Sequence, residues 1–460
     1  MNQNPSPVHR ILLTAYRFFP YFYGGGELYI HSLAKGLQEK GHRVRVLTMA
    51  PWKGGDEKQA VEEYTYEGID VTAFGFNPTL LTEGERYSGT SEHHRLIISE
   101  VIRAEAPDVI HANGLYLPTL SMAREYGIPV ILTVHNSGFA CPAGTLIRPD
   151  MSICSYAAGP NVCVPCCSMH RAPHWYSGGT IGKVPPALYR WVGKTVDGYR
   201  NIPFVMRAVR YPWLIEQELF QEREVWKMAR VIVAPSVAIQ ELLLRNGVEE
   251  KKIVIIPHGS TSFVRTAIEN IQNRPIRLGF VGQIGLHKGI HLILEALEKV
   301  RNGERCEFHI FGDGQMDDDK SFLRTALSTY RGTAKIVPHG YVKHNNLQDA
   351  YSTIDVLLVP SLAYEAFGLV VTEALSAGRP AIVSKSGALP ELIDNGKTGF
   401  IIERNNSIAL AEKIQLLIDD PEKIIEMSRH IGTVKTLSQY TDEISVLYEA
   451  LYKKRNKIKI

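Results

Sequence analysis

The chain has 460 residues, of which 45% are hydrophobic and 22% are charged. These values are typical of a folded globular protein and exclude the disordered, collagen-like and low-complexity classes. Lysine and arginine number 51 against 48 aspartate and glutamate residues, and a net charge of +3 is too low for a protein that coats nucleic acid over its whole surface. At roughly 100–200 residues per domain, this length predicts two or three domains.

The sequence predicts neither a bilayer-spanning helix nor a secretory signal. A spanning helix needs roughly 18 apolar residues with few charges, and the longest apolar stretch, 355–378, contains Glu365 and Glu373. The first ten residues are polar, and Arg17 interrupts the apolar residues that follow. We therefore expect a cytoplasmic protein. Its six cysteines would stay reduced there and serve as ligands, a nucleophile or core residues.

Short runs rich in valine and isoleucine alternate with helix-like segments. A first series covers residues 44–49, 108–111, 130–135, 231–235 and 253–257, and a second covers 277–281, 307–311, 335–337, 355–359, 381–384 and 400–402. Near-continuous apolar strands are typical of parallel sheets that are buried on both faces. The pattern predicts an α/β fold with two Rossmann-like, doubly wound parallel-sheet domains that face each other across a ligand-binding cleft.

The domain boundaries follow from where these series begin and end. An N-terminal domain is predicted at residues 1–258, with a cysteine-rich and basic–aromatic insertion at about 136–225. Residues 259–275 are polar without clear periodicity and are interpreted as a linker. A C-terminal domain is predicted at 276–435. Residues 436–460 are expected to form a helix with a basic end that packs back on the N-terminal domain.

The first helix is expected from about Glu27 to Glu39, stopping at Gly41, because glycine readily adopts the left-handed conformation of a helix cap. The sequence lacks two common nucleotide-binding motifs, because each is broken at a required glycine. Tyr29 occupies the place of the last glycine of a dinucleotide-binding motif, and Glu391 stands where a P-loop needs its first glycine. Neither an oxidoreductase nor a P-loop enzyme is expected.

Residues 360–380 carry the most informative motif. A strand is expected to end near Val359, and a helix is expected to begin near Phe367 and run to about Ala377. The free backbone N–H groups of a helix start can hold an anion such as a diphosphate. Glu373, deeper in the same helix, can accept two hydroxyl hydrogen bonds of the kind that a ribose offers.

Taken in order, the motifs resemble the retaining glycosyltransferases of the GT-B fold, in the large group called family 4. The resemblance covers nearly the whole chain and rests on Glu365 with Glu373, Gly24–Gly26, Phe280–Gly282 with Lys288 and Gly289, Ala234–Ser236, Ile256–Gly259 and Gly312–Gly314. It implies transfer of a hexose-type sugar from a UDP- or GDP-linked donor, with retention of configuration, to a glycan or lipid-linked acceptor. It also implies a role in cell-surface polysaccharide biosynthesis and no cofactor for catalysis.

The resemblance further implies roles for single residues of the C-terminal domain. Glu373 would bind the ribose, and Glu365 would lie near the hydroxyls of the donor sugar. Lys288 would neutralise the diphosphate, where negative charge grows as the sugar–phosphate bond breaks. Gln283 stands where the family usually has an arginine, and it would hydrogen-bond a phosphate without adding charge. Glycines and helix-start amides complete the donor site: Gly25, Gly26, Phe367, Gly368 and Leu369.

His135 ends a strand of the N-terminal domain where the family has a histidine that points at the donor sugar. The resemblance therefore implies a catalytic role, in which His135 hydrogen-bonds the sugar and helps to align the acceptor. A purely structural histidine is the alternative. His111 and Asn113, at the end of the neighbouring strand, are predicted to belong to the acceptor pocket.

Most of the cysteines crowd into the segment that follows His135. Cys163 and Cys166 have a spacing that lets two thiolates share a metal, and Cys141 and Cys154 would complete a tetrahedral, structural zinc site. Buried thiols without a metal are the alternative.

Between Arg171 and Leu214, seven lysine and arginine residues accompany a single acid, Asp197, and three tryptophans, Trp175, Trp191 and Trp213. Basic and aromatic side chains together suit the interface of an anionic membrane, so peripheral association with the cytoplasmic face is expected. An ordinary helical insertion is the alternative. No nucleic-acid motif accompanies the segment, and nucleic acid is not expected as a partner.

Two other functions stay open. A nucleotide-sugar 2-epimerase of the same fold would bind a UDP-sugar but need no acceptor. A non-catalytic sugar- or lipid-binding scaffold would have kept the fold and lost turnover, and Gln283 is the one residue that favours it.

Overall fold

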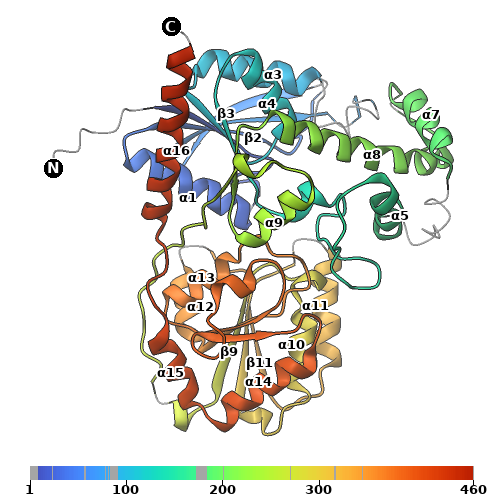
Figure 1. The fold of residues 1–460 in the computed structure, drawn as a ribbon. Helices are drawn as coiled ribbons and strands as arrows, with labels where there is room; N and C mark the ends of the chain where they lie inside the picture. The colour runs from blue at the N-terminus through green and yellow to red at the C-terminus, as the bar shows by residue number, and fades with distance from the viewer. Residues whose placement is uncertain are drawn as a thin grey trace. The chain divides into compact units, whose positions relative to one another are not determined.

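The computed structural model describes residues 9–22, 24–55, 59–77, 79–80, 82, 92–171, 184–199, 201–269, 271–314, 317–343 and 346–458. They form two compact units (Figure 1). Unit 1 comprises Met1–Pro235, Ile239–Ile256 and Tyr440–Ile460, and unit 2 comprises Ser236–Ala238 and Pro257–Gln439. The boundaries predicted above lie at residues 258 and 435. Apart from Ser236–Ala238, the chain enters unit 2 after Ile256 and leaves it after Gln439.

Unit 1 contains a sheet whose eight described strands follow the order β3-β4-β2-β1-β5-β6-β7-β8. The pairs from β4 to β8 are all parallel, as predicted. The strands are β1 (Arg10–Thr14), β2 (Arg43–Met49), β3 (Gln59–Tyr66), β4 (Ile69–Phe76), β5 (Val109–Ala112), β6 (Val130–Thr133), β7 (Val231–Ala234) and β8 (Ile253–Ile255).

The outer edge of this sheet differs from the prediction, because β3 pairs with β4 in the antiparallel sense. Neither strand was predicted. Charged residues such as Glu62 and Glu63 break the apolar run of β3, which lies exposed at the edge of the sheet. The two strands are joined through Glu67 and Gly68, whose positive φ angles of 46° and 83° are those of a tight hairpin turn.

Helices connect the strands of unit 1. The predicted first helix is confirmed as α1 (Gly25–Glu39), and the chain leaves it through Gly41 with a left-handed φ of 85°. Further elements are α3 (Glu92–Glu105), α4 (Tyr116–Glu125), η1 (Ser137–Ala140), α9 (Val237–Arg245) and η2 (Glu250–Lys252).

An insertion of helices separates β6 from β7. It contains α5 (Pro160–Arg171), α7 (Pro186–Val196) and α8 (Phe204–Met228). Helix α8 packs against α4, α5 and α7, and Figure 1 shows it running beside α4. Its buried face carries Ile215 and Leu219, which pack on α5, and Trp226, whose ring centroid lies 5.2 Å from that of Phe139 in η1.

The basic–aromatic segment is only partly described. Trp175, Lys183 and Arg200 lie outside the described residues, and the side chains of Arg171 and Arg207 are not described either. Trp213 is buried against Gly193, where an added Cβ would lie 2.4 Å from the ring. Trp213 therefore belongs to the packing between α7 and α8, and the expectation that it faces a membrane is wrong.

The last helix, α16 (Leu437–Ile458), belongs to unit 1 from Tyr440 onward. Tyr440 and Tyr448 are both fully buried, and the Tyr440 hydroxyl shares a hydrogen bond with that of Tyr29 in α1. The helices approach closely at Gly36, where a Cβ would lie 2.6 Å from the hydroxyl of Thr441. Two tyrosines of the chain's last helix thus complete the interior of unit 1.

Unit 2 contains a sheet of six described strands in the order β11-β10-β9-β12-β13-β14, and every neighbouring pair is parallel. The predicted second series is confirmed as β9 (Ile276–Val281), β10 (Cys306–Phe311), β11 (Lys335–Gly340), β12 (Val356–Val359), β13 (Ala381–Ser384) and β14 (Gly399–Ile402). The helices are α10 (Ile290–Leu297), α11 (Asp317–Thr329), α12 (Leu347–Thr353), α13 (Leu369–Ser376), α14 (Ser407–Asp419) and α15 (Glu422–His430). Single turns are η3 (Ile271–Asn273), η4 (Leu286–Lys288), η5 (Gly303–Arg305) and η7 (Leu389–Leu392).

The packing of β12 on both of its faces explains why its sequence is apolar throughout. Val356 and Leu358 belong to one core cluster, with α10 and α14, whereas Leu357 and Val359 belong to another, with α12 and α13. Successive side chains of a strand point to opposite faces of the sheet. Because helices cover both faces, no position of β12 is left for a polar side chain.

Residues 259–275 do not form the predicted linker, because they pack within unit 2. Ile268 and Ile271 join one core cluster, and Phe263 packs against the other. The guanidinium of Arg265 donates hydrogen bonds to the carbonyls of Ile431 and Gly432, at 2.6 and 2.8 Å. These apolar residues enter the core one at a time, and therefore show neither helical nor strand periodicity.

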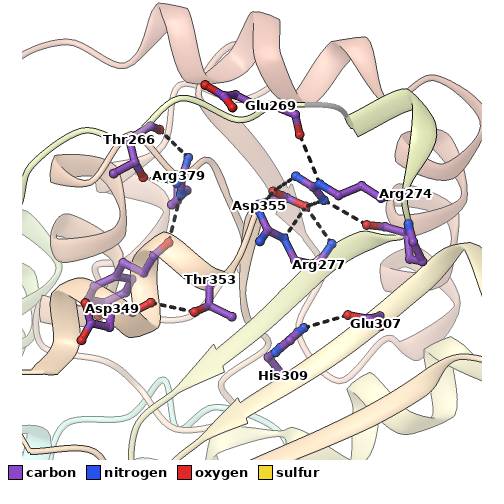
Figure 2. A network of polar contacts seen from close by, with 12 residues as sticks. Thr266, Glu269, Arg274, Arg277, Glu307, His309, Asp349, Thr353, Asp355 and Arg379 are labelled. Carbon is purple, nitrogen blue, oxygen red and sulfur yellow. Dashed lines mark hydrogen bonds and ion pairs between the residues drawn. The ribbon is translucent and has the colours of Figure 1, made fainter.

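An ionic network joins the amino-terminal ends of β9 and β12 (Figure 2). Asp355 is fully buried and accepts hydrogen bonds from the two terminal guanidinium nitrogens of Arg274, at 2.6 and 2.8 Å, and from Arg277. Burial raises the pKa of Asp355, but the hydrogen bonds from the two arginines outweigh this effect and hold the pKa below its ordinary value. The network locks the end of the sheet that is opposite to the carboxyl ends of the strands.

Within the described part of the chain, none of the helices has the length and apolarity that crossing a membrane requires.

Candidate active site

Two loops of unit 2 meet where the neighbouring strands β9 and β12 end. The carbonyl of His287 accepts hydrogen bonds from the N–H groups of Leu362 and Ala363, at 2.8 and 3.1 Å. Gly289 has a φ of 76°, and a Cβ there would lie 2.1 Å from the carbonyl oxygen of Pro360. Only glycine permits this approach. The loop after β9 is thus fixed by the loop after β12.

This loop contact joins two predicted site residues, Lys288 and Glu365. The Lys288 Nζ atom lies 2.7 Å from Oε1 of Glu365, and the Ser361 hydroxyl donates to the same oxygen. Burial raises the pKa of Glu365, but the charge and hydrogen bond of Lys288 outweigh it and hold the pKa below its ordinary value. Glu365 is therefore ionised at neutral pH. The Lys288 side chain keeps 31% of its surface exposed, so its ammonium can also reach a ligand.

Glu373 lies in α13, where 4% of its surface is exposed. Its Oε2 atom accepts a hydrogen bond of 2.6 Å from the hydroxyl of Tyr351, which is itself fully buried in α12. Burial raises the pKa of Glu373 to about 7 despite this hydrogen bond. Glu373 is thus close to equally protonated and ionised at neutral pH, and a ligand that donates hydrogen bonds would favour its charged form.

The helix with Glu373 begins two residues later than predicted. Gly368 precedes it with a left-handed φ of 112°, has no side-chain cap, and leaves α13 to start at Leu369. A Cβ at Gly368 would lie 2.8 Å from Leu389. Of the three predicted amide donors, Leu369 lies in the first turn, and Phe367 and Gly368 come just before it. The ring of Phe367 packs on His258, with centroids 5.2 Å apart.

The other predicted donor residues lie in separate places. Gln283 is half-buried in the loop between β9 and η4 of unit 2. Gly25 and Gly26 are exposed in the first turn of α1 in unit 1, and a Cβ at Gly26 would have no neighbour within 4 Å. Gly26 therefore leaves open space beside its backbone.

In unit 1, the predicted residues His135 and Asn113 contact each other at the carboxyl ends of β6 and β5. Asn113 donates through Nδ2 to the carbonyl of His111, at 3.1 Å, which turns its Oδ1 atom toward Nε2 of His135, at 2.9 Å. Because Oδ1 can only accept, Nε2 carries the proton and Nδ1 is the acceptor. Burial lowers the pKa of His135 to about 3, so the ring is neutral.

His111 is placed deeper than predicted. Its side chain is fully buried, with Nδ1 2.7 Å from the Tyr448 hydroxyl and Nε2 2.6 Å from the Thr133 hydroxyl. With both nitrogens engaged inside unit 1, His111 supports the strand ends and does not offer a polar atom to an acceptor. On the other side of the site, the ring of Tyr29 packs 4.4 Å from that of His135.

The four predicted zinc ligands come from separate elements of the insertion. Cys141 follows η1, Cys154 donates its N–H to the Leu146 carbonyl, and Cys163 and Cys166 lie one turn apart in α5. Burial raises the pKa of Cys163 to about 11, and the neighbouring thiols add to this shift. In the described part of the chain, no three His, Cys, Asp or Glu side chains are arranged to hold a metal ion. The zinc site stays a prediction, which metal analysis of the purified protein would test.

Sequence analysis assigned no site role to Ser361, Tyr351 or Tyr29. Ser361 lies two residues after the end of β12 and could have been noticed beside Glu365. Tyr351 and Tyr29 lie on the buried faces of helices, where a tyrosine is ordinary, so no local signal marks them.

The two parallel-sheet units, with charged side chains after β9 and β12 and an imidazole after β6, define a GT-B protein. Solved structures of this fold resemble the chain. A sucrose-phosphate synthase from Thermosynechococcus elongatus has a TM-score of 0.65 at 18% identity, covering 96% of this chain and 99% of that one. Anabaena Alr3699/HepE, solved in complex with UDP, has a TM-score of 0.63 at 15% identity, covering 96% and 100%.

The chain belongs to the group 1, family 4-like glycosyltransferases. The model of the glycosyl transferase 4-like domain matches residues 24–259, which is more than half of the chain, and that of the glycosyl transferases group 1 matches residues 265–433. The glycogen synthase of Mycobacterium tuberculosis is 24% identical over 90% of this chain and 86% of its own length. The D-inositol 3-phosphate glycosyltransferase of Pseudarthrobacter chlorophenolicus is 23% identical over 88% and 84%.

Proposed function

We propose that this glycosyltransferase moves a hexose from a UDP- or GDP-linked donor to a glycan or lipid-linked acceptor, with retention of anomeric configuration, in cell-surface polysaccharide biosynthesis. The observation that carries the proposal is the pairing of Lys288 with Glu365 at 2.7 Å, in the same unit as the buried Glu373. A cation, an ionised carboxylate and a carboxyl poised near neutral pH match the diphosphate, the sugar hydroxyls and the ribose of such a donor.

In the proposed reaction, the bond between the anomeric carbon and the phosphate oxygen breaks, and its electron pair stays with the diphosphate. The acceptor hydroxyl forms its bond to the same face of the anomeric carbon, and its proton passes to the released phosphate oxygen. Lys288 stabilises the charge that develops on the diphosphate. Glu365 holds Lys288 in place and accepts hydrogen bonds from the donor sugar.

Glu373 and the start of α13 bind the nucleotide in this proposal. The ribose hydroxyls donate to the Glu373 carboxylate, and the amide of Leu369 faces the diphosphate, as anions are held at helix starts. Anabaena Alr3699/HepE, a structural neighbour, is solved with UDP, which supports a uridine nucleotide as the first candidate to test.

His135 acts in this proposal as a neutral hydrogen-bonding group. Its pKa of about 3 excludes a charged imidazolium at neutral pH, and the contact with Asn113 leaves Nδ1 as the acceptor. Beside the donor sugar, the neutral ring would align a hydroxyl without taking up its proton.

We also propose peripheral attachment to the cytoplasmic face of an anionic membrane through α7 and the turn after it. Trp191 and Tyr199 are 63% and 61% exposed there, and Val205 is 67% exposed at the start of α8. Basic side chains contribute less to this attachment than the sequence predicted, because Arg190 pairs with Glu216 and Arg210 is buried beside Asp197. The exposed rings therefore carry this proposal.

A thermal-shift series with UDP, GDP, ADP, TDP and CMP tests the donor class. A ligand at 100 times its dissociation constant stabilises a protein by about 2.7 kcal/mol. Of the five nucleotides, only UDP or GDP should raise the melting temperature. This shift should disappear in Glu373→Ala. If no nucleotide shifts the wild-type protein, the donor proposal fails. Anomeric proton couplings of the product, measured by NMR, then decide whether configuration is retained.

A further inference from the structure

The buried face of α8 carries one side chain that packing does not explain. Ile215, Leu219, Glu222 and Trp226 follow at helical spacing, so a carboxyl interrupts an otherwise apolar stripe. The Oε2 atom of Glu222 is buried and has no hydrogen-bond partner in the described part of the chain. An unpaired polar atom in such a position costs free energy unless a ligand satisfies it.

Two tyrosines from other elements lie near this carboxyl. Helix α8 packs against α4, which begins at Tyr116, and the Tyr116 hydroxyl donates to the Thr133 carbonyl at the end of β6. Tyr16 follows β1, and its ring lies edge-on to that of Tyr116, with centroids 6.3 Å apart. The side chain of Tyr16 is 51% exposed. Tyr16 and Tyr116 therefore lie together at the carboxyl ends of β1, β5 and β6, and Glu222 is near enough for its charge to act on both hydroxyls.

The backbone holds this arrangement in place. The Thr14 hydroxyl donates to the Gly114 carbonyl at 2.8 Å, and a Cβ at Gly114 would lie 2.5 Å from the backbone nitrogen of Tyr16. The segments after β1 and β5 are thus in direct contact. Tyr16 and Tyr116 are positioned by this contact and by the strands themselves, which favours a built site over a chance surface cluster.

The charges around Glu222 indicate which ligand it suits. Burial, and after it the nearby Glu218, raise the pKa of Glu222 to about 8. Packing around its hydroxyl and both of these carboxylates raise the pKa of Tyr16 to about 12. Tyr116 is also near Glu222. The turn η1, which packs on α8, contains no charged residue. A phosphate would be repelled here, whereas a neutral carboxyl can both donate to and accept from hydroxyl groups.

We propose that Glu222, Tyr16 and Tyr116 form a subsite for an uncharged sugar ring of the acceptor. The exposed Tyr16 ring packs against the apolar face of the sugar, and the unpaired Glu222 oxygen hydrogen-bonds its hydroxyls. This subsite rests on the proposed transfer to a glycan acceptor. It lies wholly in unit 1, so it can be tested apart from the nucleotide site of unit 2.

Saturation-transfer NMR with maltose, methyl α-glucoside and glucosamine as probes tests the subsite at pH 7. The variants are Glu222→Gln, Glu222→Ala and Tyr16→Ala. Glu224→Gln is the matched control, because Glu224 lies on the same helix and pairs with Lys227. We expect a neutral probe to bind the wild type and Glu224→Gln. Its dissociation constant should rise at least tenfold in Glu222→Ala and Tyr16→Ala, and less in Glu222→Gln, which keeps both hydrogen-bonding functions.

Three results would overturn the subsite: unchanged binding of the neutral probes in Glu222→Ala and Tyr16→Ala, no binding of any probe to the wild type, or binding of glucosamine alone. The melting-temperature shift by nucleotides is recorded on the same samples. A lost nucleotide shift in the wild type counts against the proposed function, whereas a retained shift without sugar binding counts against the subsite alone.

Discussion

Lys288 and Glu365 form their 2.7 Å ion pair between loops that follow neighbouring strands. The positive charge of Lys288 is therefore partly balanced before a ligand binds. In the proposed reaction, the diphosphate of the donor would share Lys288 with Glu365. This sharing would keep the ammonium in position and limit how tightly the released diphosphate is held.

We therefore expect the substitution Glu365→Gln to separate binding from turnover. The freed Lys288 should bind UDP or GDP as tightly as in the wild type or more tightly, while kcat falls at least tenfold. Calorimetric titration and initial rates measure the two effects. Lys288→Ala, the matched partner, should weaken diphosphate binding and transfer together with little change in melting temperature. Unchanged turnover in Lys288→Ala would remove Lys288 from the mechanism.

Glu373 should make both stability and nucleotide binding depend on pH. Its pKa of about 7 lies above the ordinary value of 4.5, so the stability that it contributes is fully present below pH 4.5 and is lost as the pH rises through 7. The loss is on the order of 3 kcal/mol. Glu373→Gln should therefore match the wild type near pH 4 and exceed its stability at pH 8 in denaturant titrations.

Nucleotide affinity should follow the opposite course, because ribose hydroxyls donate to the ionised carboxylate. Wild-type affinity should rise between pH 6 and pH 8, by up to tenfold per pH unit below the pKa. In Glu373→Gln, the part of this slope that belongs to Glu373 should vanish, leaving only the titration of the phosphate. Equal slopes in the two proteins would contradict the assignment.

Asn113 should determine the protonation of His135. The activity of the wild type should show no histidine titration between pH 5 and pH 9, because the pKa of His135 lies near 3. Asn113→Asp places a carboxylate against Nε2, which favours the imidazolium and should introduce a new titration in the pH–rate profile. Asn113→Leu is the control, because it removes the hydrogen bond without adding charge and should lower kcat without a new titration.

Asp355 should stabilise unit 2 without affecting the rate of sugar transfer. Asp355→Asn leaves Arg274 and Arg277 without their buried partner, and should lower the free energy of unfolding by about 3 kcal/mol. Because its pKa is depressed, the contribution of Asp355 is present above its ordinary pKa and is lost as the pH falls through the native value. The exposed pair Asp394 with Lys397 supplies the control, and Asp394→Asn should change stability by less than about 0.5 kcal/mol.

Sedimentation with vesicles tests the membrane proposal. The double substitution Trp191→Ala and Tyr199→Ala should lower binding to vesicles rich in anionic lipid about tenfold, since two exposed rings are lost. Tyr156→Ala, which removes an exposed ring elsewhere in unit 1, should bind as the wild type does. Equal binding of all three proteins would leave α7 as an ordinary insertion.

The parallel strands were predictable because burial on both faces imposes an apolar sequence, as in Val356–Val359. The β3 strand was not, because an edge strand with an exposed face tolerates Glu62 and Glu63. Glu365, Glu373 and Lys288 were predicted as site residues through the family that their motifs resemble. The partners that set their protonation, Ser361 and Tyr351, approach from other parts of the fold.

In unit 1, too, the sequence predicted site residues but not the partners that orient them. His135 was predicted through the family resemblance and Asn113 from its place at the end of the neighbouring strand. The orientation of the Asn113 amide depends on the His111 carbonyl, which no sequence pattern reveals. Glu222 escaped notice because an acid in a helix is usually exposed. Its position on a buried face became visible only once α8 was seen to pack on α4.

The return of the chain to unit 1 in α16 has a consequence for synthesis. Unit 2 is continuous apart from Ser236–Ala238 and emerges from the ribosome as one stretch, whereas unit 1 waits for Tyr440 and Tyr448, which follow it. Unit 2 can therefore finish folding first, while the interior around Tyr29 and His111 stays open until translation reaches the last helix. A nascent chain stalled before residue 440 would contain all of unit 2, with Lys288, Glu365 and Glu373, but would lack the Tyr448 hydroxyl that contacts His111.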